Sequence, residues 1–136
     1  MILHRFCSEK EFAAFMCGET LTNYKSHGAA RGYAATTAVG FCFFDDDPEK
    51  AIHRLSGIVD VDVCMTVDVP EFAVRLCHGR YSNWVRPGVR DGSIILPEYC
   101  CISYDKSVFK LVDHTDKFKA YCPNASTLRK IFPGLF

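Results

Sequence analysis

Three short segments of the sequence carry side chains that are suited to chemistry. His4-Arg5 offers an imidazole and a guanidinium, Thr36-Thr37 offers two hydroxyls just before an aromatic run, and Glu98 follows a proline. The planar fork of arginine can hold a phosphate through two parallel hydrogen bonds. A fixed carboxylate can stabilise positive charge that develops in a transition state. Each segment also has an ordinary interpretation as part of a strand or loop, so their order along the chain carries the argument.

The cysteines are a second candidate for chemistry. The eight are scattered through apolar segments, and no Cys-x-x-Cys pair is present. They are Cys7, Cys17, Cys42, Cys64, Cys77, Cys100, Cys101 and Cys122. Cysteines in such segments behave as small buried hydrophobes, whereas zinc sites are commonly built from closely spaced pairs. Adjacent Cys100 and Cys101 would point to opposite faces of a strand. We therefore predict reduced thiols, no disulfide framework and no metal site.

Length and charge limit the class of protein. The chain has 136 residues, of which 49% are hydrophobic and 24% charged, and its formal net charge is zero. This length predicts one domain over 1–136, with a core over 3–112 and a tail over 113–136. A balanced charge argues against binding a nucleic-acid backbone.

We find neither the roughly 7–15 apolar residues of a secretory signal at the start nor the ~20 of a membrane span, so we expect a cytoplasmic protein without membrane contact.

Hydrophobic periodicity predicts an α+β domain, with helices early and paired strands late. The predicted strands cover 2–6, 20–24, 39–44, 60–69, 94–104 and 108–112. The predicted helices cover 9–17, a segment that begins at 46 or 47 and ends at 58, and 126–132. The predicted loops cover 25–38 and 78–91.

Capping residues and prolines set several of these boundaries. Ser8 followed by Glu11 forms a capping-box pattern, and Pro48 suits the first turn of the second helix. Pro97 interrupts a strand and so predicts an edge or a bulge. Residues 105–107 would then link two strands as a hairpin.

The whole layout resembles a known family. The motifs are Leu-His-Arg-Phe at 3–6 followed by a helix, a glycine-containing loop, Gly-Phe-Cys-Phe-Phe at 40–44 leading to an Asp-Pro helix, and Pro-Glu-Tyr at 97–99. Together they resemble the small ADP-ribosyltransferase-like domains that split NAD at its nicotinamide bond. The resemblance spans roughly 3–112. It implies split mixed or antiparallel sheets with two or three short helices, and NAD as a substrate.

The resemblance also assigns roles to residues on the first strand and in the glycine-containing loop. The residue that holds the NAD phosphates and ribose would be Arg5 or His4. The Ser/Thr motif would fall on Thr36 or Thr37, and in the branch that uses tyrosine it would be replaced by Tyr33.

The remaining roles fall on an aromatic ring and an acid. Phe41, Phe43 or Phe44 would stack on the nicotinamide, with Phe43 as the selected candidate. Glu98 would be the essential acid that stabilises the oxocarbenium-like ribose, and we expect it at a partly exposed strand end. Leu96 stands where arginine-modifying members carry a second acid or amide, which argues against arginine as the acceptor. We expect a protein acceptor.

Three alternatives remain open. The chain could be a non-catalytic binding module, such as an inhibitor or adaptor from a phage or mobile element, with the 78–91 loop as its contact surface. It could act on RNA through the arginines near that loop. A nucleophilic cysteine could pair with His4, His53 or His78. The Phe-rich tail could also seal a homodimer.

Overall fold

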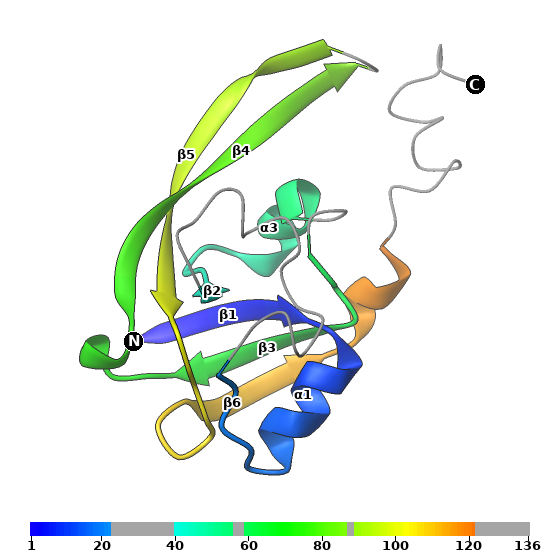
Figure 1. Ribbon diagram of the computed structural model, residues 1–136. Coiled ribbons are helices and arrows are strands. Elements are labelled where there is room, and N and C mark those ends of the chain that lie inside the picture. The colour runs from blue at the N-terminus through cyan, green and yellow to red at the C-terminus, as the bar shows by residue number, and fades with distance from the viewer. Residues whose placement is uncertain (23–39, 56–58, 87–88, 122–136) are drawn as a thin grey trace.

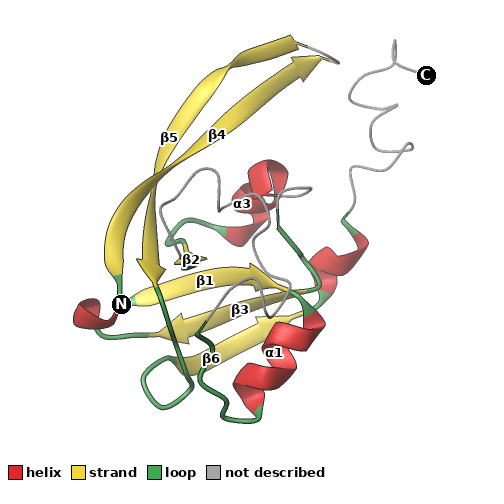
Figure 2. Ribbon diagram, viewed as in Figure 1, coloured by secondary structure: helices red, strands yellow, loops and turns green. Residues whose placement is uncertain are grey.

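Two antiparallel three-stranded sheets form the framework of the protein (Figures 1 and 2). The structure, a computed structural model, describes residues 1–22, 40–55, 59–86 and 89–121, with the side chains of 53, 54 and 78–96 left out. The first sheet has the order β1-β3-β6 and the second β2-β5-β4. The strands are β1 (Ile2–Cys7), β2 (Phe41–Phe43), β3 (Val63–Asp68), β4 (Arg75–Arg86), β5 (Val89–Cys101) and β6 (Lys110–Thr115). The helices are α1 (Glu9–Met16), α3 (Pro48–Leu55) and the short 3-10 turns η2 (Glu71–Ala73) and η3 (Lys117–Ala120).

The two helices pack on opposite faces of the first sheet. Ala14 and Phe15 of α1 join a core with Leu3 and Met65, whereas α3 packs against Phe6 and the residues around it. This division follows from strand alternation, because neighbouring residues of β1 point to opposite faces. Two apolar clusters therefore lie on either side of one sheet.

The two sheets are joined where β1 passes the end of β2. The backbone N–H of His4 donates to the Phe44 carbonyl at 2.8 Å, and the Phe44 N–H donates back to His4 at 2.9 Å. On its other side β2 pairs with β5, so β1 and β5 flank the same short strand. Gly40 permits this arrangement, because its φ is 101° and an added Cβ would lie 2.2 Å from the Cys101 carbonyl oxygen.

A buried ion pair anchors this junction. Arg5 and Glu11 are 1% and 0% exposed, and Arg5 donates to both carboxylate oxygens at 2.6 and 2.9 Å. Arg5 also donates to the Cys42 carbonyl oxygen at 2.9 Å, and the Tyr104 hydroxyl donates to Glu11 at 2.6 Å. The Arg5 guanidinium lies 5.1 Å from the centroid of the Phe41 ring, within cation–π range. The pair thus links β1, α1, β2 and the chain after β5.

The sequence located several elements correctly. β1 and α1 lie within one residue of the predicted ranges 2–6 and 9–17, and β3 lies inside the predicted range 60–69 but begins three residues later. Ser8 is the N-cap of α1 and accepts from the Glu11 N–H at 3.1 Å. Asp47 caps α3 by accepting from the Glu49 N–H at 2.9 Å. The α+β class is confirmed, while the predicted elements at 25–38 and 126–132 lie outside the described residues.

Two predictions about the later strands were wrong. Residues 78–86 and 89–91 of the predicted loop belong instead to β4 and β5, strands of 12 and 13 residues that pair as one long hairpin. Its glycines and charges suggested a loop, but ladder pairing with the neighbouring strand outweighs these local preferences. Residues 105–107 do not connect a β5–β6 hairpin, because β6 pairs with β3 in the other sheet. Pro97 lies where β5 pairs only with β4, which fits the predicted edge position.

The buried ion pair leads to a first prediction. Glu11→Gln leaves the Arg5 charge buried without its counter-charge, so the free energy of unfolding should fall by about 3–5 kcal/mol. Urea titration followed by circular dichroism measures this change. Glu9→Gln is the matched control, because Glu9 pairs with Lys119 at the surface and should leave the midpoint almost unchanged. Equal midpoints for the two variants would contradict the structural role given to the pair.

Candidate functional site

A row of side chains crosses both sheets on the face that α3 covers. His4 pairs with Phe44 on one side and with Thr66 on the other, and Thr66 pairs with Asp113. The β2–β5 register runs from Phe41–Cys101 to Phe43–Tyr99, and Glu98 lies with Cys42 and Cys100 on the face that also carries Phe44. Residues opposite one another in a sheet point to the same face. We call this set the cross-strand row: Glu98, Phe44, His4, Thr66 and Asp113.

His4 occupies the middle of the row and is half-buried. Its Nδ1 lies 2.8 Å from the Thr66 hydroxyl, and its ring centroid lies 5.7 Å from that of Phe44. Burial lowers the pKa of His4 below its usual value, while the negative charges of residues 45–47 partly oppose the shift. The imidazole is therefore mainly neutral at pH 7. One ring nitrogen can then donate a hydrogen bond to a hydroxyl group, and the other can accept one.

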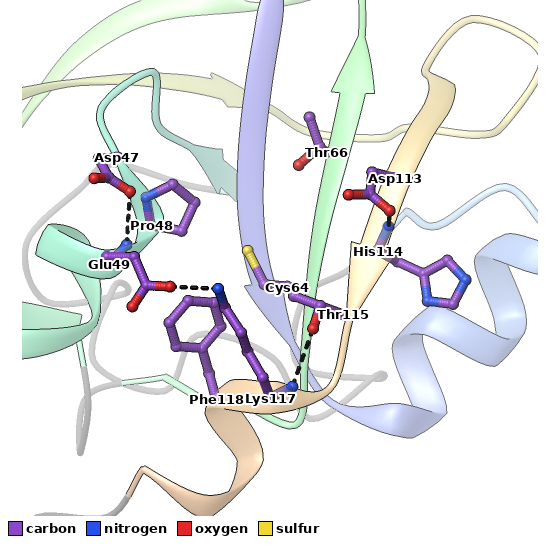
Figure 3. Close-up of a pocket in the computed structure, with 10 residues that line it drawn as sticks. All are labelled: Asp47, Pro48, Glu49, Cys64, Thr66, Asp113, His114, Thr115, Lys117 and Phe118. Atoms are coloured by element: carbon purple, nitrogen blue, oxygen red, sulfur yellow. Dashed lines mark hydrogen bonds and ion pairs between the residues drawn. The ribbon is translucent and has the colours of Figure 1, made fainter.

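A small cavity lies beside one end of the row (Figure 3). It has a volume of about 160 Å³, and Thr66 and Asp113 contribute to its wall. Lys117 forms an ion pair with Glu49 in this wall and lies 5.0 Å from the centroid of the Phe118 ring. Ligand pockets usually enclose roughly 300–1,000 Å³. This cavity therefore has room for one ring-sized group rather than for a whole dinucleotide.

Glu98 is at the other end of the row and is 2% exposed. It lies inside β5, so the expected partly exposed strand-end position was wrong. A Glu98 carboxylate oxygen and the Sγ atoms of Cys42 and Cys100 all lie within 4.8 Å of one another. Cys77 pairs with Glu98 across β4 and β5 and so shares this face. We call these side chains the sulfur–carboxylate cluster: Cys42, Cys77, Glu98 and Cys100.

The other candidates from the sequence do not join this face. Arg5 points to the opposite side of β1, where Glu11 and the Cys42 carbonyl oxygen occupy its donors. Phe43 is 0% exposed and packs on the opposite face against Tyr104. Among the aromatic residues of this segment, Phe44 is the one that lies in the row. Tyr33, Thr36 and Thr37 lie outside the described residues.

Among the described cysteines, Cys7, Cys64, Cys100 and Cys101 have raised pKa values. All seven described cysteines are reduced thiols. Burial raises the pKa of Cys64 to about 12 and that of Cys101 to about 12. Hydrogen bonding with Cys42 raises the pKa of Cys100, and burial raises it further. Reactive cysteines need a lowered pKa, so these observations argue against the cysteine–histidine alternative.

The sulfur–carboxylate cluster is the feature that sequence reasoning missed. Its members come from three strands, and Cys42 and Cys100 are 58 residues apart in the sequence. A search for closely spaced ligands cannot find such a group. The pattern Glu-x-Cys at 98–100 placed two of its members on one face, but the register with Cys42 and Cys77 needs the folded sheet.

Comparison with known proteins adds no relative. No protein-family model, no curated protein and no solved structure matches the chain significantly. The ADP-ribosyltransferase-like family therefore stays a prediction. In the described part of the chain, no helix combines the length and apolarity needed to cross a membrane.

The buried thiols predict a loss of stability at alkaline pH. The unfolded chain releases a thiol proton near pH 9, whereas folded Cys64 and Cys101 keep theirs up to about pH 12. The stabilisation is therefore complete below pH 9 and is lost as the pH rises towards 12, by up to about 1.4 kcal/mol per pH unit for each thiol. Urea titrations from pH 8 to 11 measure the slope. Cys64→Ala should reduce it, and exposed Cys17→Ala should not; equal slopes in both variants would contradict this origin.

Proposed function

We propose that the protein binds NAD and breaks the bond between nicotinamide and ribose, with transfer of ADP-ribose to a protein acceptor or to water. One observation carries the proposal. His4 and Glu98, which are distant in the sequence, lie on one face of the two sheets, which also carries the Phe44 ring beside His4. These are the residue types, on the two strands, that the resemblance of the sequence assigns to NAD.

The chemistry assigns a role to each member of the row. When the C–N bond breaks, its electron pair leaves with nicotinamide, and the ribose gains oxocarbenium character. The Glu98 carboxylate accepts a hydrogen bond from the ribose 2′-hydroxyl and offsets this charge, as carboxylates do in glycosidases. Neutral His4 orients a ribose hydroxyl, and the Phe44 ring provides an apolar surface for the nicotinamide. The acceptor then attacks C1′ and gives its proton to a carboxylate or to solvent.

Burial sets a condition on this mechanism. Because Glu98 is 2% exposed, NAD must open a path to the carboxylate when it binds. The cavity of about 160 Å³ near Thr66 is large enough for one ring only, so most of the dinucleotide would lie on the surface beside the row.

Nicotinamide release by the purified protein tests the proposal. Glu98→Gln keeps the shape of the side chain but removes its charge, and it should lower the rate of nicotinamide release by about 100-fold or more. Glu71→Gln is the matched control, because Glu71 is an exposed acid in η2 and should leave the rate unchanged. Chromatography of the reaction mixture measures the release, and circular dichroism verifies folding. NAD left intact by the wild-type protein would overturn the proposal.

A second candidate function is binding without catalysis. The observation in its favour is an apolar groove of about 720 Å³, along which Phe72, Leu76 and Ile102 are 88%, 55% and 71% exposed. Large exposed apolar groups of this kind mark interaction surfaces. The simplest partner is a second copy of this chain.

Sedimentation velocity tests this second candidate. The wild-type protein should self-associate as its concentration rises, because association removes the apolar side chains from water. A Phe72→Ser, Ile102→Ser double variant should remain monomeric, while Val112→Ser, at an apolar position that is 58% exposed but outside the groove, should behave as the wild type. A monomeric wild-type protein at all concentrations would contradict self-association through the groove.

A further inference from the structure

The sulfur–carboxylate cluster is built by the register of the second sheet. Cys42 of β2 pairs with Cys100 of β5, and Cys77 of β4 pairs with Glu98 of β5. Glu98 and Cys100 are two residues apart on one strand and therefore face the same side. Two thiols and one carboxylate thus lie together, with Cys77 beside Glu98 in the register, on the face that carries the second apolar cluster.

The distances inside the cluster match those around a tetrahedral metal ion. The Sγ atoms of Cys42 and Cys100 lie 3.5 Å apart, and a Glu98 oxygen lies within 4.8 Å of both. A zinc ion with Zn–S bonds of about 2.3 Å holds two sulfur ligands roughly 3.8 Å apart. A disulfide would require the two sulfurs to approach to about 2.05 Å. The present separation is thus close to that of two ligands of one ion, and far from that of a bond.

Cys77 is the candidate for a fourth donor. It pairs with Glu98 across β4 and β5 and so borders the cluster on the same face, and it is half-buried rather than fully enclosed. Structural zinc sites take four protein ligands in tetrahedral geometry. Cys42, Glu98 and Cys100 give three ligands that already lie together, and rotation of the Cys77 side chain would complete the four.

The ligands of the cluster are shielded from water, and a groove beside them gives a cation access from solvent. Cys42, Glu98 and Cys100 are 3%, 2% and 7% exposed, so water would compete little for the ion. Cys77 and Cys100 also contribute to the wall of the apolar groove, and this opening connects the cluster with solvent. Burial among apolar side chains strengthens the attraction between an ion and charged ligands.

We propose that the sulfur–carboxylate cluster binds a thiophilic divalent cation, and that Zn²⁺ is the ion that its ligands favour. Soft thiolates select zinc over magnesium or calcium, which prefer ligand sets made of oxygen alone. The bound ion ties β2, β5 and β4 together in the sheet that carries the long hairpin. Each thiol gives up its proton to solvent as the ion binds.

This inference stands independently of the proposed reaction with NAD. The two share Glu98, which cannot bind the ion and stabilise a ribose at the same time. Metal binding should therefore inhibit nicotinamide release if both proposals hold. Direct metal titration involves no NAD, so failure of one proposal can be told from failure of the other.

Titration of the full chain with Co²⁺ tests the site. The protein is first treated with a chelator and kept reduced with a phosphine. Co²⁺ should give the intense charge-transfer and visible bands of a tetrahedral thiolate complex, and one equivalent of Zn²⁺ should abolish them. Cys77→Ser should weaken Co²⁺ binding by more than the roughly 10–100-fold that follows the loss of an outer-shell partner. Glu98→Gln should shift the visible bands, because it replaces a charged oxygen ligand.

Control variants separate the site from general thiol binding. Cys17→Ser, which removes an exposed cysteine outside the cluster, should leave both the spectrum and the affinity unchanged. Circular dichroism verifies that each variant is folded, and Cys77→Ser is expected to fold because its side chain is only half-buried. Absence of cobalt–thiolate bands in the reduced wild-type protein would overturn the proposal. Equal Co²⁺ affinity of Cys77→Ser and Cys17→Ser would overturn the assignment of the ligands.

Discussion

The buried ion pair between Arg5 and Glu11 is the interaction on which the rest of the structure depends. Removal of two charges from water is costly, and the cost is offset only when every donor and acceptor is satisfied. Here the guanidinium binds both oxygens of Glu11 and the Cys42 carbonyl, while Tyr104 donates to the same carboxylate. The contact with Cys42 fixes β2 beside β1. Since β2 also pairs with β5, the ion pair sets the relative position of the two sheets and of every side chain that lies across their junction.

Side chains alternate between the two faces along β1, so the neighbouring residues His4 and Arg5 have different surroundings. Arg5 points to the α1 side and stabilises the fold, whereas His4 points to the α3 side and joins the cross-strand row. Either residue type could hold a phosphate or a ribose, and the sequence alone left both open. The structure separates them: Arg5 is 1% exposed and bound by protein groups, whereas His4 is half-buried and interacts with Thr66, which lines the cavity. The cross-strand row therefore lies on the face opposite the ion pair.

The sequence predicted the local features of the fold better than its long-range pairing. Ser8 and Asp47 carry capping signals that act within a few residues, and both were located correctly. The 78–91 hairpin and the position of β6 depend on partners elsewhere in the chain, and both were predicted wrongly. The same distinction applies to the candidate site. Glu98 was identified by its residue type and its proline, but its burial and its approach to Cys42 follow from a register that no short motif encodes.

The central claim is that His4 forms part of a surface that binds NAD. Nuclear magnetic resonance of the imidazole C–H groups tests it directly, with a chelator present so that no cation occupies the cluster, and with His4→Gln used to assign the His4 signals. Addition of NAD should shift the His4 signals in a saturable way and leave the methyl signal of Met16 almost unchanged, because Met16 is exposed at the end of α1, which packs on the opposite face of the sheet. His4 signals that do not move at saturating NAD, or that move no more than the Met16 methyl signal, would contradict the account.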